Sequence, residues 1–336
     1  MSSSTLFLTG GSGYVGRNLI RRLRADGHHV RALVRSPQAA AVVQALGAQP
    51  VQGDLLDPAI VTAMEGCAAL IHAAADTDHR NASPSQWQTN VEGTRNVLTA
   101  ARAAYVPVAI VLSSESALTT GASLHQARED HPYPARAAGT YGASKAEAER
   151  VALALSTPQF AVKVLRPRFV WGRDNTTAMP YLLQAVRSGR FAWIDGGHYL
   201  TSATHVDNVG EAVSCALTRG AGARIYHICD GAPVPFRRLI AAQLQAYGVQ
   251  PPDKQVPRAL LRVFIGLDDL FRTLRLPLRA PMTRQEFASS AVEVTLDDRR
   301  ARTELGYRPV VTLEGGIAML KRQVAEQNRG STTCRR

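Results

Sequence analysis

The sequence predicts an α/β protein in which a doubly wound parallel sheet is followed by a smaller C-terminal lobe. The first half of the chain alternates short β-rich runs with helix-length segments, a glycine-rich turn follows the first run, and the regular alternation ends after Gly172. Alternating strands and helices are typical of a parallel sheet wrapped by helices. Such a sheet binds its ligands at the carboxyl ends of its strands.

The expected strands are short apolar runs, and the segments between them have the apolar spacing of helices. We expect strands at Thr5–Thr9, His29–Val34, Gln49–Gln52, Ala69–His72, Val108–Ser113 and Val162–Arg166. We expect helices at Tyr14–Ala25, Gln38–Leu46, Pro58–Met64, Ser85–Ala104 and Tyr141–Leu155.

The break after Gly172 divides the chain into two regions. Residues 1–172 form the sheet domain, and 173–199 with 231–327 form the second lobe. Residues 200–230 return to the sheet, because Ala203–Leu217 has a helical pattern and Ile225–Cys229 a strand pattern. The polar segment 328–336 is expected to be a disordered tail.

Composition excludes several classes of protein. The net charge is +12, which favours an acidic partner, a membrane surface or a phosphorylated ligand. The basic residues are dispersed without a recognition motif, so we expect no nucleic-acid partner. The four cysteines lie far apart, so no metal site is expected. Apolar stretches are shorter than the roughly 20 residues that span a bilayer, and no secretory pattern opens the chain. We therefore expect a soluble cytoplasmic protein.

The glycine-rich turn predicts a dinucleotide site in residues 1–172. Gly10, Gly13 and Gly16 lie between the first strand and the first helix, which is the context that a phosphate-binding turn requires. Gly10 allows the tight turn, Gly13 lets the backbone approach a diphosphate, and Gly16 lets helix and strand pack closely. The amides at the helix N-terminus then bind the phosphates.

The end of the second strand favours NADP(H), although NAD(H) stays possible. An acidic residue there would bind the adenosine ribose, whereas an arginine can hold a 2′-phosphate. The strand is followed by Arg35 and has no carboxylate. Asp54 follows the third strand, where it can accept from the adenine amino group or cap the next helix.

Tyr141 and Lys145 form the predicted catalytic pair. Their i, i+4 spacing at the start of a helix places the phenol and the ammonium on one face. An unperturbed tyrosine has a pKa of about 10, and a nearby ammonium lowers this pKa by stabilising the phenolate. Lys145 can also reach the nicotinamide ribose.

Two polar positions support this pair. Ser113 and Ser114 close the fifth strand, where a hydroxyl can polarise a substrate carbonyl. We favour Ser114, with Ser116 as the alternative, although this cluster can also serve as a turn cap. Asn90 sits inside a helix, where asparagine is disfavoured. It can kink the helix or hold a water near Lys145, or be an exposed helical asparagine.

The motifs together resemble the extended short-chain dehydrogenase/reductase superfamily, whose sheet domain is a Rossmann fold. The resemblance is carried by the turn 9–16 (TGGSGYVG), 53–55 (GDL), 72–75 (HAAA), 90–94 (NVEGT), Ser113–Ser114, 141–145 (YGASK) and 165–167 (LRP), which keep family order. It implies the catalytic residues Ser114, Tyr141, Lys145 and Asn90. It also implies cofactor contacts from Gly10, Ser12, Gly13, Tyr14, Val15, Gly16, Arg35, Asp54, Leu55, Ala73, Ala74, Lys145 and Pro167.

Within the superfamily the chain is most similar to the 3β-hydroxysteroid dehydrogenase branch, which includes sterol and 3-oxoacyl relatives. The stretches 165–172, 204–208, 281–284 and 305–309 carry that similarity. It implies interconversion of a secondary alcohol and a ketone on an apolar substrate, and it leaves a homodimer possible. The main alternative is a nucleotide-sugar epimerase or dehydratase with the same Tyr and Lys. Those enzymes usually have an asparagine where this chain has Phe169, which favours an apolar substrate. A non-catalytic dinucleotide-binding regulator is a further alternative.

The segment 258–279 is a last candidate feature. Leucines and phenylalanines at 260, 264, 267, 271 and 274 recur at helical spacing among five arginines. This pattern predicts a helix packed on the second lobe, a lid, or a surface helix in peripheral contact with a membrane.

Overall fold

The computed structural model describes residues 3–79, 83–273 and 280–333, and its centre is a seven-stranded sheet. The spatial order is β12-β7-β5-β4-β1-β2-β3, with every pairing parallel. The strands are β1 (Thr5–Thr9), β2 (His29–Val34), β3 (Gln49–Gln52), β4 (Ala69–His72), β5 (Val108–Leu112), β7 (Ala161–Pro167) and β12 (Arg224–Ile228). The prediction of a doubly wound parallel sheet is confirmed.

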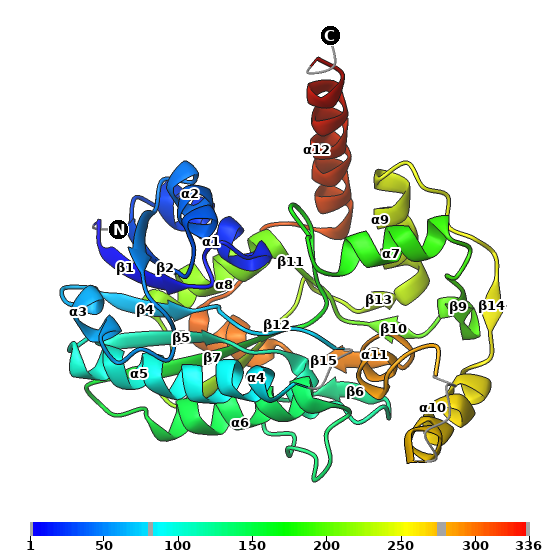
Figure 1. Ribbon diagram of the computed structural model, residues 1–336, viewed down its shortest axis with the longest axis horizontal. Coiled ribbons are helices and arrows are strands. Elements are labelled where there is room, and N and C mark those ends of the chain that lie inside the picture. The colour runs from blue at the N-terminus through cyan, green and yellow to red at the C-terminus, as the bar shows by residue number, and fades with distance from the viewer. Residues whose placement is uncertain (1–2, 80–82, 274–279, 334–336) are drawn as a thin grey trace.

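Helices cover both faces of this sheet. One layer contains α1 (Tyr14–Ala25), α2 (Pro37–Ala45) and α8 (Val206–Thr218), and the other contains α3 (Ile60–Met64), α5 (Gly93–Ala103) and α6 (Thr140–Ala154). Figure 1 shows α1 and α2 above the strands and α5 and α6 below them. Leu6 and Leu8 face the first layer and Phe7 faces the second, as strand alternation requires.

The expected continuous helix at Ser85–Ala104 is divided into three parts. A short helix α4 (Pro84–Trp87) leads into a π-helical turn η1 (Gln88–Glu92), after which α5 begins. A π turn inserts an extra residue into the helical ladder. The apolar periodicity alone predicted a continuous helix, and the interruption lies at Asn90, for which a kinked helix was one of the expectations.

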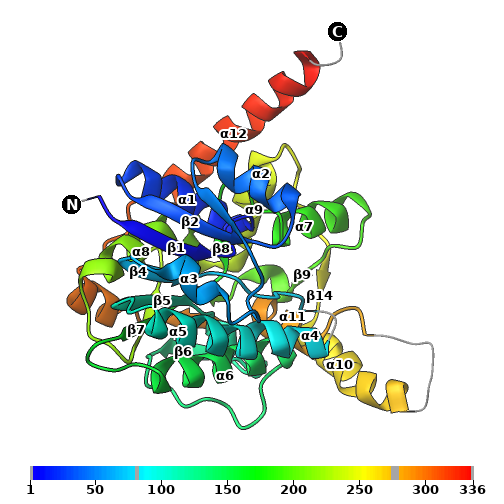
Figure 2. The same ribbon diagram turned by 60° about the vertical axis from the view of Figure 1, so that its left-hand side comes forward.

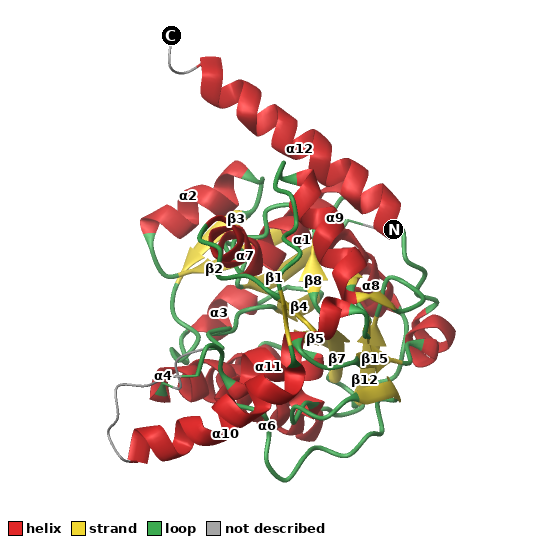
Figure 3. Ribbon diagram, turned by 90° about the vertical axis from the view of Figure 1, so that its right-hand side faces the viewer, coloured by secondary structure: helices red, strands yellow, loops and turns green. Residues whose placement is uncertain are grey.

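The second lobe is built on a small mixed sheet in the order β13-β10-β15-β6. Its strands are β13 (Val234–Pro235), β10 (Leu200–Thr201), β15 (Val294–Leu296) and β6 (Leu124–Ala127), and two pairs lie beside it: β8 (Val170–Trp171) with β11 (Thr204–His205), and β9 (Trp193–Ile194) with β14 (Gln255–Val256). Its helices are α7 (Ala178–Arg187), α9 (Phe236–Ala246), α10 (Arg258–Thr273) and α11 (Arg284–Ser290). Figure 3 shows α10 and α11 on the same side of the molecule.

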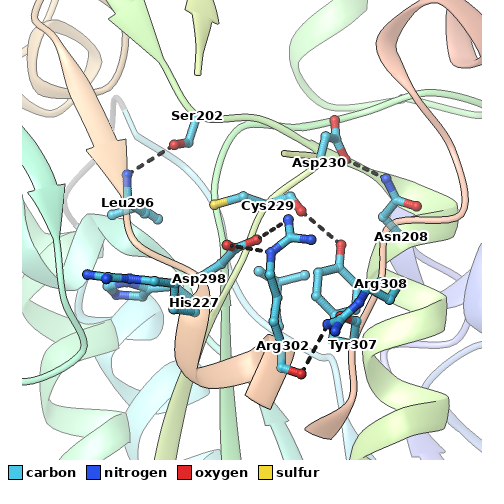
Figure 4. Close-up of polar contacts among 12 residues, drawn as sticks. Ser202, Asn208, His227, Cys229, Asp230, Leu296, Asp298, Arg302, Tyr307 and Arg308 are labelled. Atoms are coloured by element: carbon cyan, nitrogen blue, oxygen red, sulfur yellow. Dashed lines mark hydrogen bonds and ion pairs between the residues drawn. The ribbon is translucent and has the colours of Figure 1, made fainter. Parts of the chain in front are cut away.

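The two regions interleave more than the expected boundaries allowed. Strand β6, from within residues 1–172, pairs with β15 in the second sheet. The π turn η4 (Ala301–Leu305) and Tyr307, which were assigned to the second lobe, pack into the core of the first domain. The Tyr307 hydroxyl donates to the Cys229 carbonyl at 3.0 Å, so the C-terminal segment is tied to the end of β12 (Figure 4).

The last helix, α12 (Leu313–Thr333), leads away from the body of the molecule (Figure 2). It is helical through Thr333, within the segment for which a disordered tail was expected, and 334–336 lie outside the described residues. No helix in the described part of the chain is long and apolar enough to cross a bilayer.

Candidate active site

The glycine turn between β1 and α1 is shaped by close backbone contacts. Gly10 has a φ of +72°, and a Cβ at this residue would lie 2.6 Å from the Ala74 amide nitrogen. A Cβ at Gly16 would lie 2.0 Å from the Gly10 carbonyl oxygen, so only glycine fits both positions. Helix α1 has Gly13 as its N-cap without a side-chain cap. Its first amides therefore face a cradle that fits a diphosphate.

The other expected cofactor contacts lie around this turn. Ser12 and Val15 are half-buried in it, Ala73 and Ala74 follow β4 directly opposite Gly10, and Pro167 ends β7. Arg35 is exposed directly after β2. These contacts stay predictions.

Three of the expected contacts also have structural roles. The carboxylate of Asp54 accepts from the Leu56 amide at 2.9 Å, which closes the turn after β3. Leu55 is buried in the core beside Gly93. The Tyr14 side chain is buried, and burial raises the pKa of its phenol. Only its backbone is therefore available to a ligand.

A buried hydrogen-bond chain joins the turn to the π-helical segment. Burial lowers the pKa of His72 to about 3, so its imidazole is neutral at physiological pH. Thr94 Oγ1 donates to the Asn90 carbonyl at 2.6 Å and therefore accepts from His72 Nε2 at 2.9 Å. His72 Nδ1 then accepts from Thr9 Oγ1 at 2.7 Å. The chain fixes the end of β4 and the π turn relative to the glycine turn.

Ser114, Tyr141 and Lys145 meet beyond the carboxyl end of β5. Tyr141 and Lys145 lie one turn apart on α6 and are 7% and 6% exposed. The Ser114 hydroxyl, at the residue before the 3₁₀ turn η2 (Glu115–Leu118), interacts with the Tyr141 phenol and lowers its pKa. Three of the four groups in the predicted catalytic set therefore lie at one site, with Tyr141 and Lys145 buried and Ser114 half-buried.

Burial shifts both titratable groups toward their neutral forms. It raises the pKa of Tyr141, with the Glu115 carboxylate adding to this increase and the Ser114 hydrogen bond opposing it. It lowers the pKa of Lys145 to about 8, against the attraction of Glu149. Lys145 Nζ donates to the Leu112 carbonyl at 2.9 Å, at the end of β5.

Asn90 supports the site through backbone and helix contacts. Its Nδ2 donates at 3.0 Å to both Ser144 Oγ and the Asp76 carbonyl, and its Oδ1 accepts from the Asp76 amide at 2.8 Å. Ser144 lies on α6 between Tyr141 and Lys145. Asn90 is thus a buried residue that holds α6 and the segment after β4 together.

The structure adds groups that sequence reasoning did not single out. The His79 ring lies 4.7 Å from the Tyr141 ring, centroid to centroid, with a 41° angle between the planes. Glu115, next to Ser114, is buried and paired with Arg168. No local pattern marks His79. A carboxylate at a strand end beside two serines was the one available signal for Glu115.

Phe169 lies in an apolar part of the second lobe. It has a φ of +42°, a conformation that is unusual for a bulky residue. Its ring meets Phe236 edge-on at 5.7 Å, and the Tyr199 ring stacks on Phe236 at 5.4 Å. Strained backbone of this kind occurs most often at functional sites.

Comparisons with known proteins extend over nearly the whole chain. The model of the NAD dependent epimerase/dehydratase family matches residues 6–229. A 4-hydroxy-2-methyl-3-oxo-4-farnesyl-3,4-dihydroquinoline-1-oxide ketoreductase of Stigmatella aurantiaca is 44% identical, covering 94% of this chain and 95% of its own. A decarboxylating sterol-4-alpha-carboxylate 3-dehydrogenase of Dictyostelium discoideum is 32% identical, covering 93% and 98%. The crystal structure of gox2253 superposes with a TM-score of 0.76 and 28% identity, covering 96% of this chain and 99% of that one.

Proposed function

The chain belongs to the NAD dependent epimerase/dehydratase family, and we propose that it is a nicotinamide-dependent oxidoreductase that interconverts a secondary alcohol and a ketone on an apolar substrate. The motifs predicted this superfamily and its steroid dehydrogenase branch, and the family match and the relatives confirm both. The observation that carries this proposal is the buried Tyr141 phenol, which lies beside the Ser114 hydroxyl and one helical turn from Lys145 on α6.

Tyr141, Lys145 and Ser114 have different roles in the proposed reaction. The nicotinamide supplies or accepts the hydride when it is bound. In the reductive direction Tyr141 donates its phenolic proton to the carbonyl oxygen, and in the oxidative direction the phenolate takes the hydroxyl proton. Lys145 stabilises the phenolate by its charge. When a substrate oxygen is bound beside it, Ser114 donates to the developing alkoxide instead of to a neighbouring side chain.

The substrate class rests on relatives and on the second lobe. The relatives are named for a farnesylated quinoline and a sterol carboxylate, which share a large apolar framework. In this chain Phe169, Phe236 and Tyr199 form an aromatic cluster in the lobe that follows β7. Aromatic surface favours apolar rings and chains, so we assign this lobe to the apolar part of the substrate.

We assign NADP(H) as the preferred cofactor, on the basis of Arg35. Arginine binds phosphate through several charge-assisted hydrogen bonds, and no carboxylate occupies the end of β2 to bind a free ribose hydroxyl. A homodimer and a cytoplasmic location also stay predictions. Sedimentation velocity on the purified chain tests the first, and fractionation of the native cells tests the second.

The decisive experiment follows NADPH and NADH absorbance with panels of steroid and 3-oxoacyl ketones, for the wild type and Tyr141→Phe. We expect Tyr141→Phe to lose turnover while it binds cofactor as the wild type does. Tyr105→Phe, at a residue that is 92% exposed, is the matched control. A Tyr141→Phe variant with the wild-type rate contradicts the proposal.

Two outcomes would select the alternatives. Conversion of a nucleotide sugar without net consumption of NADPH would indicate an epimerase. Cofactor binding without turnover of any panel member would favour the regulatory protein.

A further inference from the structure

A buried ion pair lies directly behind Ser114. Glu115 and Arg168 are 4% and 1% exposed, and one oxygen of the Glu115 carboxylate accepts from the Arg168 guanidinium. Arg168 also donates to the Val294 carbonyl at 3.2 Å and to the Ser289 carbonyl at 3.0 Å. The guanidinium is therefore held by β15 and α11. Burying two charges costs desolvation energy that their attraction does not always repay, so stability alone is a weak reason for the pair.

The other carboxylate oxygen reaches the catalytic serine. Ser114 Oγ donates to Glu115 Oε2 at 2.8 Å, and the Ser116 amide donates to Ser114 Oγ at 3.2 Å. A serine hydroxyl has a single proton. While that proton is given to Glu115, Ser114 cannot donate it to a Tyr141 phenolate, so Glu115 opposes ionisation of the phenol by this route as well as by its charge.

We propose that Glu115, held by Arg168, is a positioning residue that orients the Ser114 hydroxyl and holds a negative charge near the Tyr141 phenol. This inference rests on the proposed function. It assigns a role to the Glu115–Arg168 pair, which the hydride-transfer mechanism does not use.

Four groups set the electrostatic surroundings of Tyr141. Glu115 and Asp76 are acidic and raise the pKa of the phenol, Lys145 on the same helix is basic, and the His79 ring packs against the phenol ring. Glu115 is the larger of the two acidic contributions. A phenol that keeps its proton at alkaline pH remains an acid for ketone reduction, so the pair extends reduction to higher pH.

The test is the pH profile of ketone reduction by Glu115→Gln. The amide is close to isosteric but uncharged, so it removes the carboxylate charge and keeps an oxygen acceptor. We expect the alkaline limb, where reduction is lost, to move toward acid by about one pH unit, as expected for removal of a nearby like charge. We also expect kcat to fall with little change in KM, because an amide oxygen is a weaker acceptor than a carboxylate and orients the Ser114 hydroxyl less firmly.

The matched control is Glu129→Gln. Glu129 is another buried carboxylate, 7% exposed, which accepts from the His227 amide at 3.1 Å and lies 3.6 Å from Arg300. We expect the wild-type pH profile from this variant. If Glu115→Gln leaves Arg168 unpaired and so fails to fold, a double variant takes its place. Glu115→Gln with Arg168→Met removes both charges. Its alkaline limb should still differ from that of the wild type. An unchanged limb and kcat in the folded variant overturns the inference.

A second readout separates this inference from the proposed function. Tyrosinate absorbance is followed during titration with base, and the contribution of Tyr141 is obtained by subtracting the matching Tyr141→Phe protein. The phenol should ionise at lower pH in Glu115→Gln than in the wild type, whether or not a ketone is turned over. Equal ionisation in both proteins overturns the inference, while failure of every ketone overturns only the proposed function.

Discussion

Asn90 donates from Nδ2 to Ser144 Oγ at 3.0 Å and so joins the π-helical turn to the helix that carries Tyr141. Ser144 Oγ in turn donates to the Tyr141 carbonyl at 2.9 Å. Asn90, which the sequence placed inside a helix, therefore bonds to the helix that carries Tyr141. Its other hydrogen bonds fix the backbone of Asp76.

Asn90→Ala should impair catalysis more than cofactor binding. The substitution removes the link between η1 and α6, and a small displacement of a catalytic group can cost about 100-fold in rate. We expect a loss of that order in kcat, measured under saturating cofactor, with an unchanged cofactor Kd. Asn96→Ala is the control, because Asn96 donates to the Leu55 carbonyl at 2.6 Å and not to α6. Equal loss in both variants would contradict the positioning role of Asn90.

Lys145 should make the stability of the ligand-free protein rise with pH. Its pKa is about 8 in the folded chain and 10.5 ordinarily, so between these values the unfolded chain binds more protons. Unfolding free energy then increases by up to about 1.4 kcal/mol per pH unit in that window. We expect this gain, measured by denaturant unfolding, for the wild type relative to Lys145→Met. If the unfolding free energies of the two proteins changed with pH in parallel, the pKa of Lys145 would not be lowered in the folded chain.

Gly16→Ala should disrupt the dinucleotide turn. The added methyl would lie 2.0 Å from the Gly10 carbonyl oxygen, so α1 must move away from β1. We expect lost cofactor binding by titration calorimetry and a lower melting temperature. Gly266→Ala is the contrasting variant, since it lies inside α10 with open space around its Cβ and should stabilise by about 0.5–1 kcal/mol. Normal cofactor affinity in Gly16→Ala would refute the account of the turn.

Arg35→Ala should weaken NADPH binding selectively. Hydrogen bonds to a charged group contribute about 1.5–3 kcal/mol, which corresponds to roughly 10- to 100-fold in Kd. We expect this loss for NADPH and none for NADH, measured by fluorescence titration. Arg102→Ala, on the exposed surface of α5, is the control. If Arg35→Ala and the wild type bound NADPH with equal affinity, Arg35 would not contact the 2′-phosphate.

Helix α10 should bind anionic vesicles through its outer face. Leu261 and Ile265 are buried in the second lobe, whereas Leu260, Val263, Phe264 and Leu267 are 36–57% exposed on one helical stripe. The side chains of 268–273 and residues 274–279 lie outside the described part of the chain. An exposed apolar stripe on a protein of net charge +12 suits an anionic interface.

Cosedimentation with vesicles of phosphatidylcholine and phosphatidylglycerol measures this binding. We expect Val263→Ser with Phe264→Ser to lower the bound fraction, and Tyr105→Ser, at an exposed aromatic elsewhere, to leave it unchanged. A wild-type protein that stays in the supernatant rules out the membrane contact, and α10 is then only a helix packed on the lobe.

Local sequence determined the sheet domain and most of the candidate site. Strand alternation, the spacing of Gly10, Gly13 and Gly16, and the i, i+4 pair at 141 and 145 are short-range patterns, and each has a direct backbone consequence. Helix α1 and strands β1 to β4 accordingly lie where the sequence places them. The residue types at 114, 141 and 145 indicated proton transfer, because few other side chains can perform it.

Tertiary structure alone decided the surroundings of those groups. The π turn at Asn90, the return of residues 301–307 to the first core, and the contact between Glu115 and Arg168, 53 residues apart, depend on packing between distant segments. Local patterns contain no information on such pairings, since burial and hydrogen-bond partners exist only after the chain has folded. The sequence by itself thus specified which groups react, and the folded structure decided which charges and hydrogen bonds control their protons.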